Sequence, residues 1–253
     1  MTPRVRREEL AAVGFANGDL YNRARPDYPA DAISHLVLTL GLSPASNVVD
    51  LGAGTGIFSR QIQPFVGRLT AVEPSASMRE SFRNSTSDAE VLEGTDVAIP
   101  VADASVDALF VAQAFHWFDA PRALVEIHRV LVPAGGLGII VNKRDTSVGW
   151  VRDLDEAMRW DVEPPYLRGS DFTSVIAAGP FTDVRCASFA HFQVLTRDGM
   201  YERVLTTSYI SIMESGPRDE LMSRVATVVD ALPEPIVLPH VTDVYTARAS
   251  TEG

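Results

Sequence analysis

A glycine-rich segment carries the clearest chemical pattern in this chain. Residues 50–56 read Asp-Leu-Gly-Ala-Gly-Thr-Gly, so glycine occupies every second position from Gly52 to Gly56. Without a Cβ, the backbone can turn sharply and a ligand can approach it closely. An acidic residue, Glu73, follows about 20 residues later, where dinucleotide-binding folds hold ribose hydroxyls with a carboxylate. This spacing predicts a site for a nucleotide-like cofactor.

The residues after the second glycine separate two classes of cofactor. A loop for the pyrophosphate of a nicotinamide dinucleotide follows G-x-G-x-x-G, with a small last residue that lets the helix pack on the strand. That last position is Ile57 when the pattern starts at Gly52, and Ser59 when it starts at Gly54. The observed G-x-G-x-G instead favours a loop for the methionine part of S-adenosylmethionine. A nicotinamide-dependent oxidoreductase and a non-catalytic cofactor-binding protein on the same fold are the alternatives.

Two further segments have side chains suited to an adenine ring and to an organic acceptor. In residues 94–100, Asp96 is a short acid that can accept the adenine amino group, while Val97 can flank the ring. Residues 112–118 hold three aromatic side chains and His116. Indole and imidazole can each form a hydrogen bond, so this segment suits an apolar pocket that also offers a hydrogen-bonding group. The simpler interpretation of Asp96 is a solvated turn residue, and that of residues 112–118 is a packed apolar turn.

Alternating strands and helices must bring these segments together. Apolar spacing, β-branched runs and proline positions predict the boundaries. Strands are expected at 47–51, 69–73, 91–92, 106–111, 137–141 and 241–247, and helices at 29–40, 57–65, 75–82, from 119, 150–160, 197–212 and 218–232. This order favours a parallel sheet with helices on both faces, whose ligands bind beyond the carboxyl ends of the strands. The candidate residues follow those ends.

The length of the chain fits one α/β domain. Its 253 residues can bury a sizeable core, and they contain no clean linker. We expect a single domain over 1–253, with an N-terminal cap segment at 1–28 and a cofactor-binding core at 29–141. Residues 142–235 are expected to add helices that cover the substrate, and 236–253 to form the final strand and tail.

Composition excludes several classes of partner. The net charge is −11 and Lys143 is the only lysine, so the basic face that a nucleic-acid binder needs is not expected. No apolar run approaches the ~20 residues that span a bilayer, and residues 1–20 do not resemble a signal peptide. The single cysteine, Cys186, suggests neither a disulfide nor a metal site. We expect a cytoplasmic protein, a monomer or homodimer, that acts on a small molecule.

Together these segments resemble the class I S-adenosylmethionine-dependent methyltransferases of the trans-aconitate methyltransferase-like type (methyltransferase type 11). Residues 21–29 are similar to that group's Tyr/Arg-Pro-x-Tyr-Pro segment, and 128–136 to its turn into the fifth strand. The resemblance covers residues 20–142 well and reaches 207–209 and 238–242 more loosely. It implies a Rossmann-like fold, with a mostly parallel seven-stranded sheet, helices on both faces and an inserted helical cover.

The resemblance also implies roles for individual residues. Asp50 would lie near the amino group of the cofactor's methionine, Glu73 would hold the ribose, and Asp96 the adenine. The expected cofactor-binding residues are Tyr21, Arg25, Asp50, Gly52, Ala53, Gly54, Glu73, Pro74, Asp96, Val97, Gln113 and Ala114. The expected substrate-binding residues are Phe115, His116, Trp117, Arg144, Trp150 and Tyr209. Alternatively, Arg25 forms a surface ion pair, and Trp150 and Tyr209 pack the helical cover onto the sheet.

The expected reaction moves a methyl group from S-adenosylmethionine to an O, N or C atom of the acceptor, leaving S-adenosylhomocysteine. A carboxylate and a natural-product intermediate are candidate acceptors. A carboxylate needs no general base, whereas a phenol, hydroxyl or carbon acceptor does, and His116 is the predicted catalytic base. The chain departs from the family pattern at His240, where tyrosine is expected, so the role of this residue is left open.

Overall fold

The structure is a computed structural model that describes residues 18–86, 89–159 and 171–251. The chain divides into two compact units, each assembled from three separate stretches. The first unit comprises residues 1–26, 144–165 and 190–241, and the second comprises 27–143, 166–189 and 242–253. The single domain over 1–253 that the sequence analysis expects stays a prediction.

In the described part of the chain, seven strands form one sheet in the order β3-β2-β1-β4-β5-β7-β6. The strands are β1 (Asn47–Leu51), β2 (Arg68–Val72), β3 (Glu90–Leu92), β4 (Val106–Ala112), β5 (Leu131–Arg144), β6 (Phe181–Leu195) and β7 (Ile236–Ala249). Each neighbouring pair from β3 to β5 is parallel, and the sheet contains one antiparallel hairpin. The predicted mostly parallel, seven-stranded sheet is confirmed. Strand order reverses between β1 and β4, and open sheets bind ligands at such a switch point.

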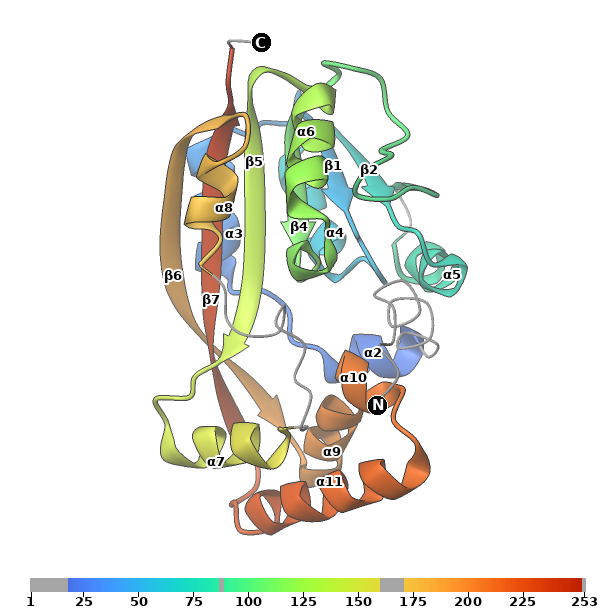
Figure 1. Cartoon of the computed structure of the whole chain (residues 1–253), viewed down its shortest axis with the longest axis vertical. Coiled ribbons are helices and arrows are strands. Elements are labelled where there is room, and N and C mark those ends of the chain that lie inside the picture. Colours follow the sequence, from blue (N-terminus) through green and yellow to red (C-terminus); the bar gives the residue numbers. More distant parts are fainter. Residues whose placement is uncertain (1–17, 87–88, 160–170, 252–253) are drawn as a thin grey trace. The chain divides into compact units, whose positions relative to one another are not determined.

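Helices cover both faces of the sheet in the second unit (Figure 1). One face packs against α3 (Ala30–Leu40) and α4 (Ile57–Ile62), and the other against α6 (Ala120–Val130) and α8 (Thr173–Ala177). α5 (Ala76–Ser85) contributes Phe82 to a smaller apolar cluster with β2 and β3. Successive side chains of a strand point to opposite faces, so Leu109 packs with α6 and Phe110 with α3 and α4. This two-sided burial explains the continuous apolar run of β4.

The first unit has an apolar core of its own. Its helices are α2 (Gly18–Ala24), α7 (Gly149–Ala157), α9 (Arg197–Leu205), α10 (Ser208–Ser211) and α11 (Ser215–Val229). Leu221, Val225 and Val229 recur every four residues, so they form one buried stripe of α11. They pack against Val151 and Leu154 of α7. Apolar residues at helical spacing therefore hold this unit together.

Two parts of the sheet differ from the sequence-based prediction. Residues 142–235 contain the strand β6 in addition to helices, and the sequence analysis placed no strand in this span. Past Phe181, the side chains of β6 are exposed or half-buried, so it lacks the apolar run that marked the buried strands. β5 begins at Leu131 rather than Leu137, and its register with β4 shifts between Val106 and Ala108.

None of the helices in the described ranges combines the length and the apolar composition that crossing a membrane requires.

Candidate functional site

The glycine loop joins the end of β1 to the start of α4 in the second unit. Gly52, Gly54 and Gly56 have φ angles of +73°, +57° and +84°, which L side chains rarely adopt. A Cβ on Gly52 would lie 2.7 Å from the Cβ of Ala114, so the loop passes directly against the segment after β4. A Cβ on Gly54 would meet no atom of the part of the chain that the structure describes within 4 Å. The loop therefore turns tightly at Gly52 and faces open space at Gly54.

Asp50 is a fully buried acid beside this loop. Its Oδ2 accepts a hydrogen bond of 2.5 Å from Ser59 Oγ, whereas its buried Oδ1 has no hydrogen-bond partner among the described residues. The pKa of this carboxyl is raised to about 7, mainly because burial disfavours the charged form; the Ser59 bond opposes the shift, and repulsion from Glu73 contributes to it. A buried oxygen with no donor is costly unless a ligand supplies one. This geometry fits an ammonium group placed at Oδ1.

Glu73 ties the loop to the turn after β2. Its Oε2 accepts from the Gly54 N–H and its Oε1 from the Ser75 N–H, each at 2.9 Å. Burial raises the pKa of this carboxyl, and the two N–H donors oppose the shift. A carboxylate oxygen has two lone pairs, so each can still accept from a hydroxyl group. The next residue, Pro74, is exposed, and its carbonyl accepts from Arg79 at 2.7 Å.

Asp96 lies in the turn after β3, where its Oδ2 accepts the N–H of Asp119 at 2.9 Å. Asp119 precedes the first turn of α6, so Asp96 joins its turn to the start of that helix. The neighbouring Val97 is half-buried. The placement leaves the second oxygen of Asp96 available to another donor.

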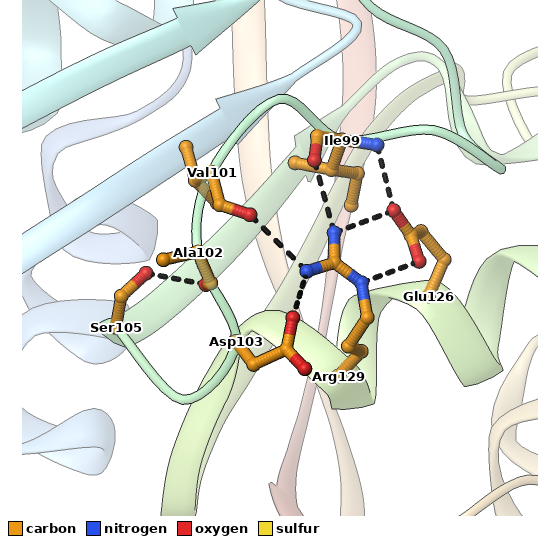
Figure 2. Close-up of polar contacts among 7 residues, drawn as sticks. All are labelled: Ile99, Val101, Ala102, Asp103, Ser105, Glu126 and Arg129. Carbon is orange, nitrogen blue, oxygen red and sulfur yellow. Dashed lines mark hydrogen bonds and ion pairs between the residues drawn. The ribbon is translucent and has the colours of Figure 1, made fainter.

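Arg129 of α6 anchors the segment that follows this turn (Figure 2). Its guanidinium donates to the carbonyls of Ile99 and Val101 at 3.0 and 3.1 Å. It pairs with both carboxylate oxygens of Glu126 at 2.7 and 2.8 Å, and with Asp103 at 2.5 Å. These bonds raise the pKa of Arg129, and the Arg129 bonds lower the pKa of Glu126. The arginine thereby holds the segment in one conformation.

Gln113 follows β4 with a φ of +54°, which is uncommon outside glycine. Its Nε2 donates to the Asn142 carbonyl at 3.0 Å. Asn142 Nδ2 in turn donates to the Asp27 carbonyl at 3.1 Å, and its Oδ1 accepts from Thr242 Oγ1 at 2.5 Å. The sequence analysis missed Asn142, although a polar residue near the end of an apolar strand was a usable signal. The next residue, Ala114, is the one whose Cβ would lie 2.7 Å from a Cβ placed on Gly52.

The aromatic segment forms a single turn of 3₁₀ helix, Phe115–Trp117. Phe115 is buried in the core, with ring centroids 5.0 Å from Phe172 and 5.9 Å from Phe118. His116 and Trp117 are half-buried, with ring centroids 5.3 Å apart. Phe115 thus anchors the turn, whereas His116 and Trp117 are the members a ligand can reach. Substrate binding by all three stays a prediction.

The remaining predicted site residues belong to the first unit. Arg25 donates from Nη2 to the Thr206 carbonyl at 2.6 Å, and Arg144 forms an ion pair with Asp155. The Tyr209 hydroxyl donates to the Met158 carbonyl at 2.7 Å, and Trp150 packs against the apolar core of this unit. Tyr21 lies in α2, and its side chain is outside the described residues. Roles for these residues in cofactor or substrate binding stay predictions.

Comparison with known proteins agrees with this geometry. Residues 49–139 match the model of a methyltransferase domain. An uncharacterized methyltransferase of Mycobacterium tuberculosis is 35% identical over 242 residues, which cover 94% of this chain and 95% of that protein. A malonyl-[acyl-carrier protein] O-methyltransferase of Pectobacterium atrosepticum is 30% identical over 163 residues, which cover 63% of this chain and 60% of that protein.

Solved structures show the same fold at low identity. The YcgJ protein of Bacillus subtilis superposes with a TM-score of 0.60 at 16% identity, covering 89% of this chain and 100% of that one. A proposed methyltransferase from an antibiotic biosynthesis pathway of Anabaena variabilis gives 0.62 at 17% identity, covering 88% and 98%. The fold is thus the Rossmann-like fold of class I methyltransferases. The chain belongs to the methyltransferase family, as an S-adenosylmethionine-dependent enzyme. None of these relatives singles out the trans-aconitate subgroup, which stays a prediction.

Proposed function

We propose that the chain binds S-adenosylmethionine in the second unit and transfers its methyl group to a small-molecule acceptor. The observation that carries this proposal is the pairing of two features at the end of β1. Asp50 is fully buried, and its Oδ1 accepts no hydrogen bond from the described residues. The glycine loop beside it faces open space at Gly54. A buried acceptor beside an open main-chain surface suits the ammonium and chain of a methionine moiety.

The proposed binding mode uses the contacts described above. Asp50 Oδ1 accepts from the ammonium, and the main chain of 52–54 borders the methionine chain. Glu73 accepts from the ribose hydroxyls while its N–H donors keep the loop in place. Asp96 and Val97 border the adenine ring, and Gln113 and Ala114 border the cofactor from the β4 side.

Bound S-adenosylmethionine supplies an electrophilic methyl group on a positively charged sulfur. The protein's task is to hold the acceptor atom in line with that methyl group, and such positioning contributes about 7–11 kcal/mol in favourable cases. His116 takes the proton from an acceptor hydroxyl or carbon acid, and Trp117 limits the access of water. An already ionised acceptor uses the same positioning without the proton transfer.

Two observations bear on the class of acceptor. The chain has a net charge of −11 and a single lysine, a composition that does not favour attraction to a nucleic acid. One relative is named as a malonyl-[acyl-carrier protein] O-methyltransferase, which supports a carboxylate oxygen as one candidate acceptor atom. The nicotinamide alternative is not favoured, because Ile57 stands where the dinucleotide loop needs a small residue.

Calorimetry with S-adenosylhomocysteine and with NADH tests the cofactor assignment. We expect saturable binding of S-adenosylhomocysteine in the micromolar range and none of NADH. Transfer of radiolabelled methyl groups from S-adenosylmethionine to a panel of small acids, phenols and amines then tests the reaction. A protein that takes up neither S-adenosylmethionine nor S-adenosylhomocysteine at millimolar concentration would refute the proposal.

A further inference from the structure

Three side-chain amides of the second unit bond to main-chain groups that are far away from them in the sequence. Gln61 lies in α4, the helix that follows the glycine loop. Asn142 lies near the end of β5. Gln113 follows β4, and His116 comes three residues later. We call Gln61, Asn142 and Gln113 the amide belt.

Gln113 is fastened to β5 at two points. Its N–H donates to the Ile140 carbonyl and its Nε2 to the Asn142 carbonyl, each at 3.0 Å. Its φ of +54° is a strained conformation for a residue with a side chain. Such strain persists only where the surroundings hold it, and it is frequent at functional sites. Residues 140–142 of β5 therefore fix the direction in which the chain leaves β4.

Asn142 is itself held from two sides. The Asp27 carbonyl oxygen can only accept, so the atom 3.1 Å from it is the amide nitrogen, Nδ2. The Thr242 hydroxyl donates to the other amide atom, Oδ1, at 2.5 Å. Both side chains are buried, and loss of either partner would leave a buried polar atom unpaired, which is costly. The position of Asn142 is thus set by β7 and by residue 27.

Gln61 holds the residue next to Asp27. Its Oε1 accepts the Tyr28 N–H at 2.9 Å, and its Nε2 donates to the Tyr28 carbonyl at 2.8 Å. The buried Tyr28 ring also packs edge-on against Phe58 of α4, with centroids 5.8 Å apart. Hydrogen bonds therefore run from α4 through residues 27–28 to Asn142 and on to Gln113.

We propose that the amide belt positions the turn of His116, residues 113–118, against the glycine loop, with Asn142 as the central positioning residue. This inference rests on the proposed function, because it concerns the geometry of methyl transfer at the same site. One end of the belt lies in the helix that leaves the glycine loop, and the other end begins the turn of His116. The distance between these two parts matters in an in-line transfer.

The belt is expected to govern turnover more than cofactor affinity. The glycine loop has fastenings of its own, from the Gly54 N–H to Glu73 and from Ser59 to Asp50. A weakened belt leaves these bonds in place and frees the turn of His116 to shift. A misplacement of about 1 Å can lower a rate about 100-fold.

Three variants of the full chain and one control test the belt. Asn142→Leu keeps the branching of the side chain and removes its donor and its acceptor. Thr242→Val removes only the donor to Asn142 Oδ1, whereas Thr242→Ser keeps a hydroxyl there. Thr246 is a buried threonine four residues along the same strand, so Thr246→Val is the matched control for Thr242→Val.

Hydrogen exchange measured by mass spectrometry reports on the turn without needing an acceptor. Peptides that cover residues 113–118 are expected to exchange about fivefold faster or more in Asn142→Leu and in Thr242→Val, because the turn opens locally. Thr242→Ser and Thr246→Val are expected to exchange there as the wild type does. Peptides from β2 serve as the internal reference and are expected to be unchanged in all four proteins.

Methyl-transfer kinetics separate positioning from cofactor binding. The assay uses the compound in the panel of acids, phenols and amines that the wild type methylates fastest. Asn142→Leu and Thr242→Val are expected to lower kcat about 10–100-fold, while the Kd of S-adenosylhomocysteine changes less than about threefold. Thr242→Ser is expected to restore kcat, and Thr246→Val to leave it unchanged.

Several outcomes would overturn the belt. These are wild-type exchange of residues 113–118 in Asn142→Leu, equal losses of turnover in Thr242→Val and Thr246→Val, and a loss of cofactor affinity as large as the loss of turnover. If Asn142→Leu does not fold, the milder pair Thr242→Val and Thr242→Ser decides by the same readouts. A wild type that binds no S-adenosylhomocysteine would instead overturn the proposed function, and hydrogen exchange would still decide whether Asn142 holds the turn.

Discussion

At the scale of single residues, Asp50 links cofactor binding to pH. Its pKa of about 7 means that the free protein holds a neutral carboxyl at pH 5 and an ionised one above neutrality. The proposed contact with an ammonium favours the ionised form. A proton must therefore leave when ligand binds at low pH, and this proton release weakens binding there.

The first prediction follows from this linkage. The affinity for S-adenosylhomocysteine is expected to rise by up to about tenfold per pH unit from pH 5 to 7, and then to level off. Calorimetry across pH 5 to 8.5 measures the slope. Asp50→Asn cannot lose the proton, so its residual affinity is expected to be flat over the same range. A pH-independent affinity of the wild type would contradict the contact.

The raised pKa of Asp50 also makes the stability of the ligand-free protein depend on pH. The pKa of Asp50 in the folded protein lies above the ordinary aspartic acid value of 3.8, so Asp50 favours folding while it is protonated. That contribution is complete below about pH 4 and is lost as the pH rises to about 7. Denaturant unfolding at several pH values is therefore expected to show the wild type losing stability relative to Asp50→Asn across this window.

His116 is the residue to which we assign proton transfer. His116→Ala is expected to lower the turnover of an acceptor with an ionisable hydroxyl by about 10²–10⁴-fold, because it removes a general base. The affinity for S-adenosylhomocysteine is expected to stay nearly unchanged. Radiometric assays and calorimetry measure the two quantities. Equal losses in both would assign His116 to the fold or to cofactor binding.

His128 provides the matched control for this substitution. It is half-buried, and its Nε2 lies 3.0 Å from the Ser250 carbonyl oxygen, so its ring has a structural partner. His128→Asn is expected to change stability without changing turnover at a temperature where the protein is folded.

At the scale of secondary-structure elements, local pattern decided what the sequence could predict. β1 was predicted at 47–51, as observed, because its β-branched run ends in glycine. The strand β6 was missed because most of its side chains are exposed, so its place comes from pairing with β7 rather than from its own residues. The loop after β1 was predictable for the same reason as β1, since three glycines at fixed spacing carry the signal within seven residues.

The glycine loop yields a prediction that separates backbone strain from ligand contact. Gly54 and Gly41 have φ angles of +57° and +67°, and a Cβ on either would have no described neighbour within 4 Å. Alanine at each is expected to cost a similar ~1–2 kcal/mol of unfolding free energy, from left-handed strain alone. Only Gly54→Ala is expected to weaken S-adenosylhomocysteine binding, by about tenfold or more, because its Cβ enters the ligand's space.

Gly52→Ala completes this comparison. Its Cβ would lie 2.7 Å from the Ala114 Cβ, so overlap adds to the strain and stability is expected to fall further than in either other variant. Thermal unfolding and calorimetry of the three proteins measure both effects. Equal binding losses in Gly41→Ala and Gly54→Ala would show that strain, not contact, governs affinity.

The anchored segment next to Asp96 gives a second prediction at this scale. Arg129→Met removes the bonds to the Ile99 and Val101 carbonyls, and is expected to cost about 1–3 kcal/mol of stability. Because the same segment borders the proposed adenine position, the affinity for S-adenosylhomocysteine is expected to fall about tenfold. Calorimetry and denaturant unfolding measure the two losses.

Arg248 is the matched control for Arg129. It also donates to backbone carbonyls in the second unit, those of Thr39, Leu40 and Ala134, but none of them belongs to the proposed site. Arg248→Met is expected to lower stability without lowering affinity. If both variants lose affinity equally, general destabilisation and not the anchored segment explains the effect.

At the scale of the whole molecule, the chain passes repeatedly between its two units. The loop residues of the cofactor site were predictable because they lie close together in the sequence. Asn142 and Thr242 contact each other across 100 positions. No local pattern marks such pairs, so they became visible only in the folded chain.

This arrangement predicts that the segment with the family match cannot stand alone. A fragment of residues 27–143 contains the matched domain at 49–139 but lacks β6 and β7. β7 pairs beside β5 and supplies the buried Val244 and Tyr245 to the apolar clusters on both faces. Without β7, β5 would present an open edge and these clusters would meet water, which favours aggregation.

We therefore expect the fragment to be aggregated or unfolded and to show no saturable S-adenosylhomocysteine binding, while the full chain melts cooperatively and binds. Size-exclusion chromatography, circular dichroism and calorimetry measure these properties. A point variant of the full chain, Val244→Ala, serves as a milder test of the same packing and is expected to cost about 1–3 kcal/mol, because it leaves a cavity beside the sheet. A monomeric fragment that unfolds cooperatively and binds like the full chain would show that β7 completes the fold without being needed for the cofactor site.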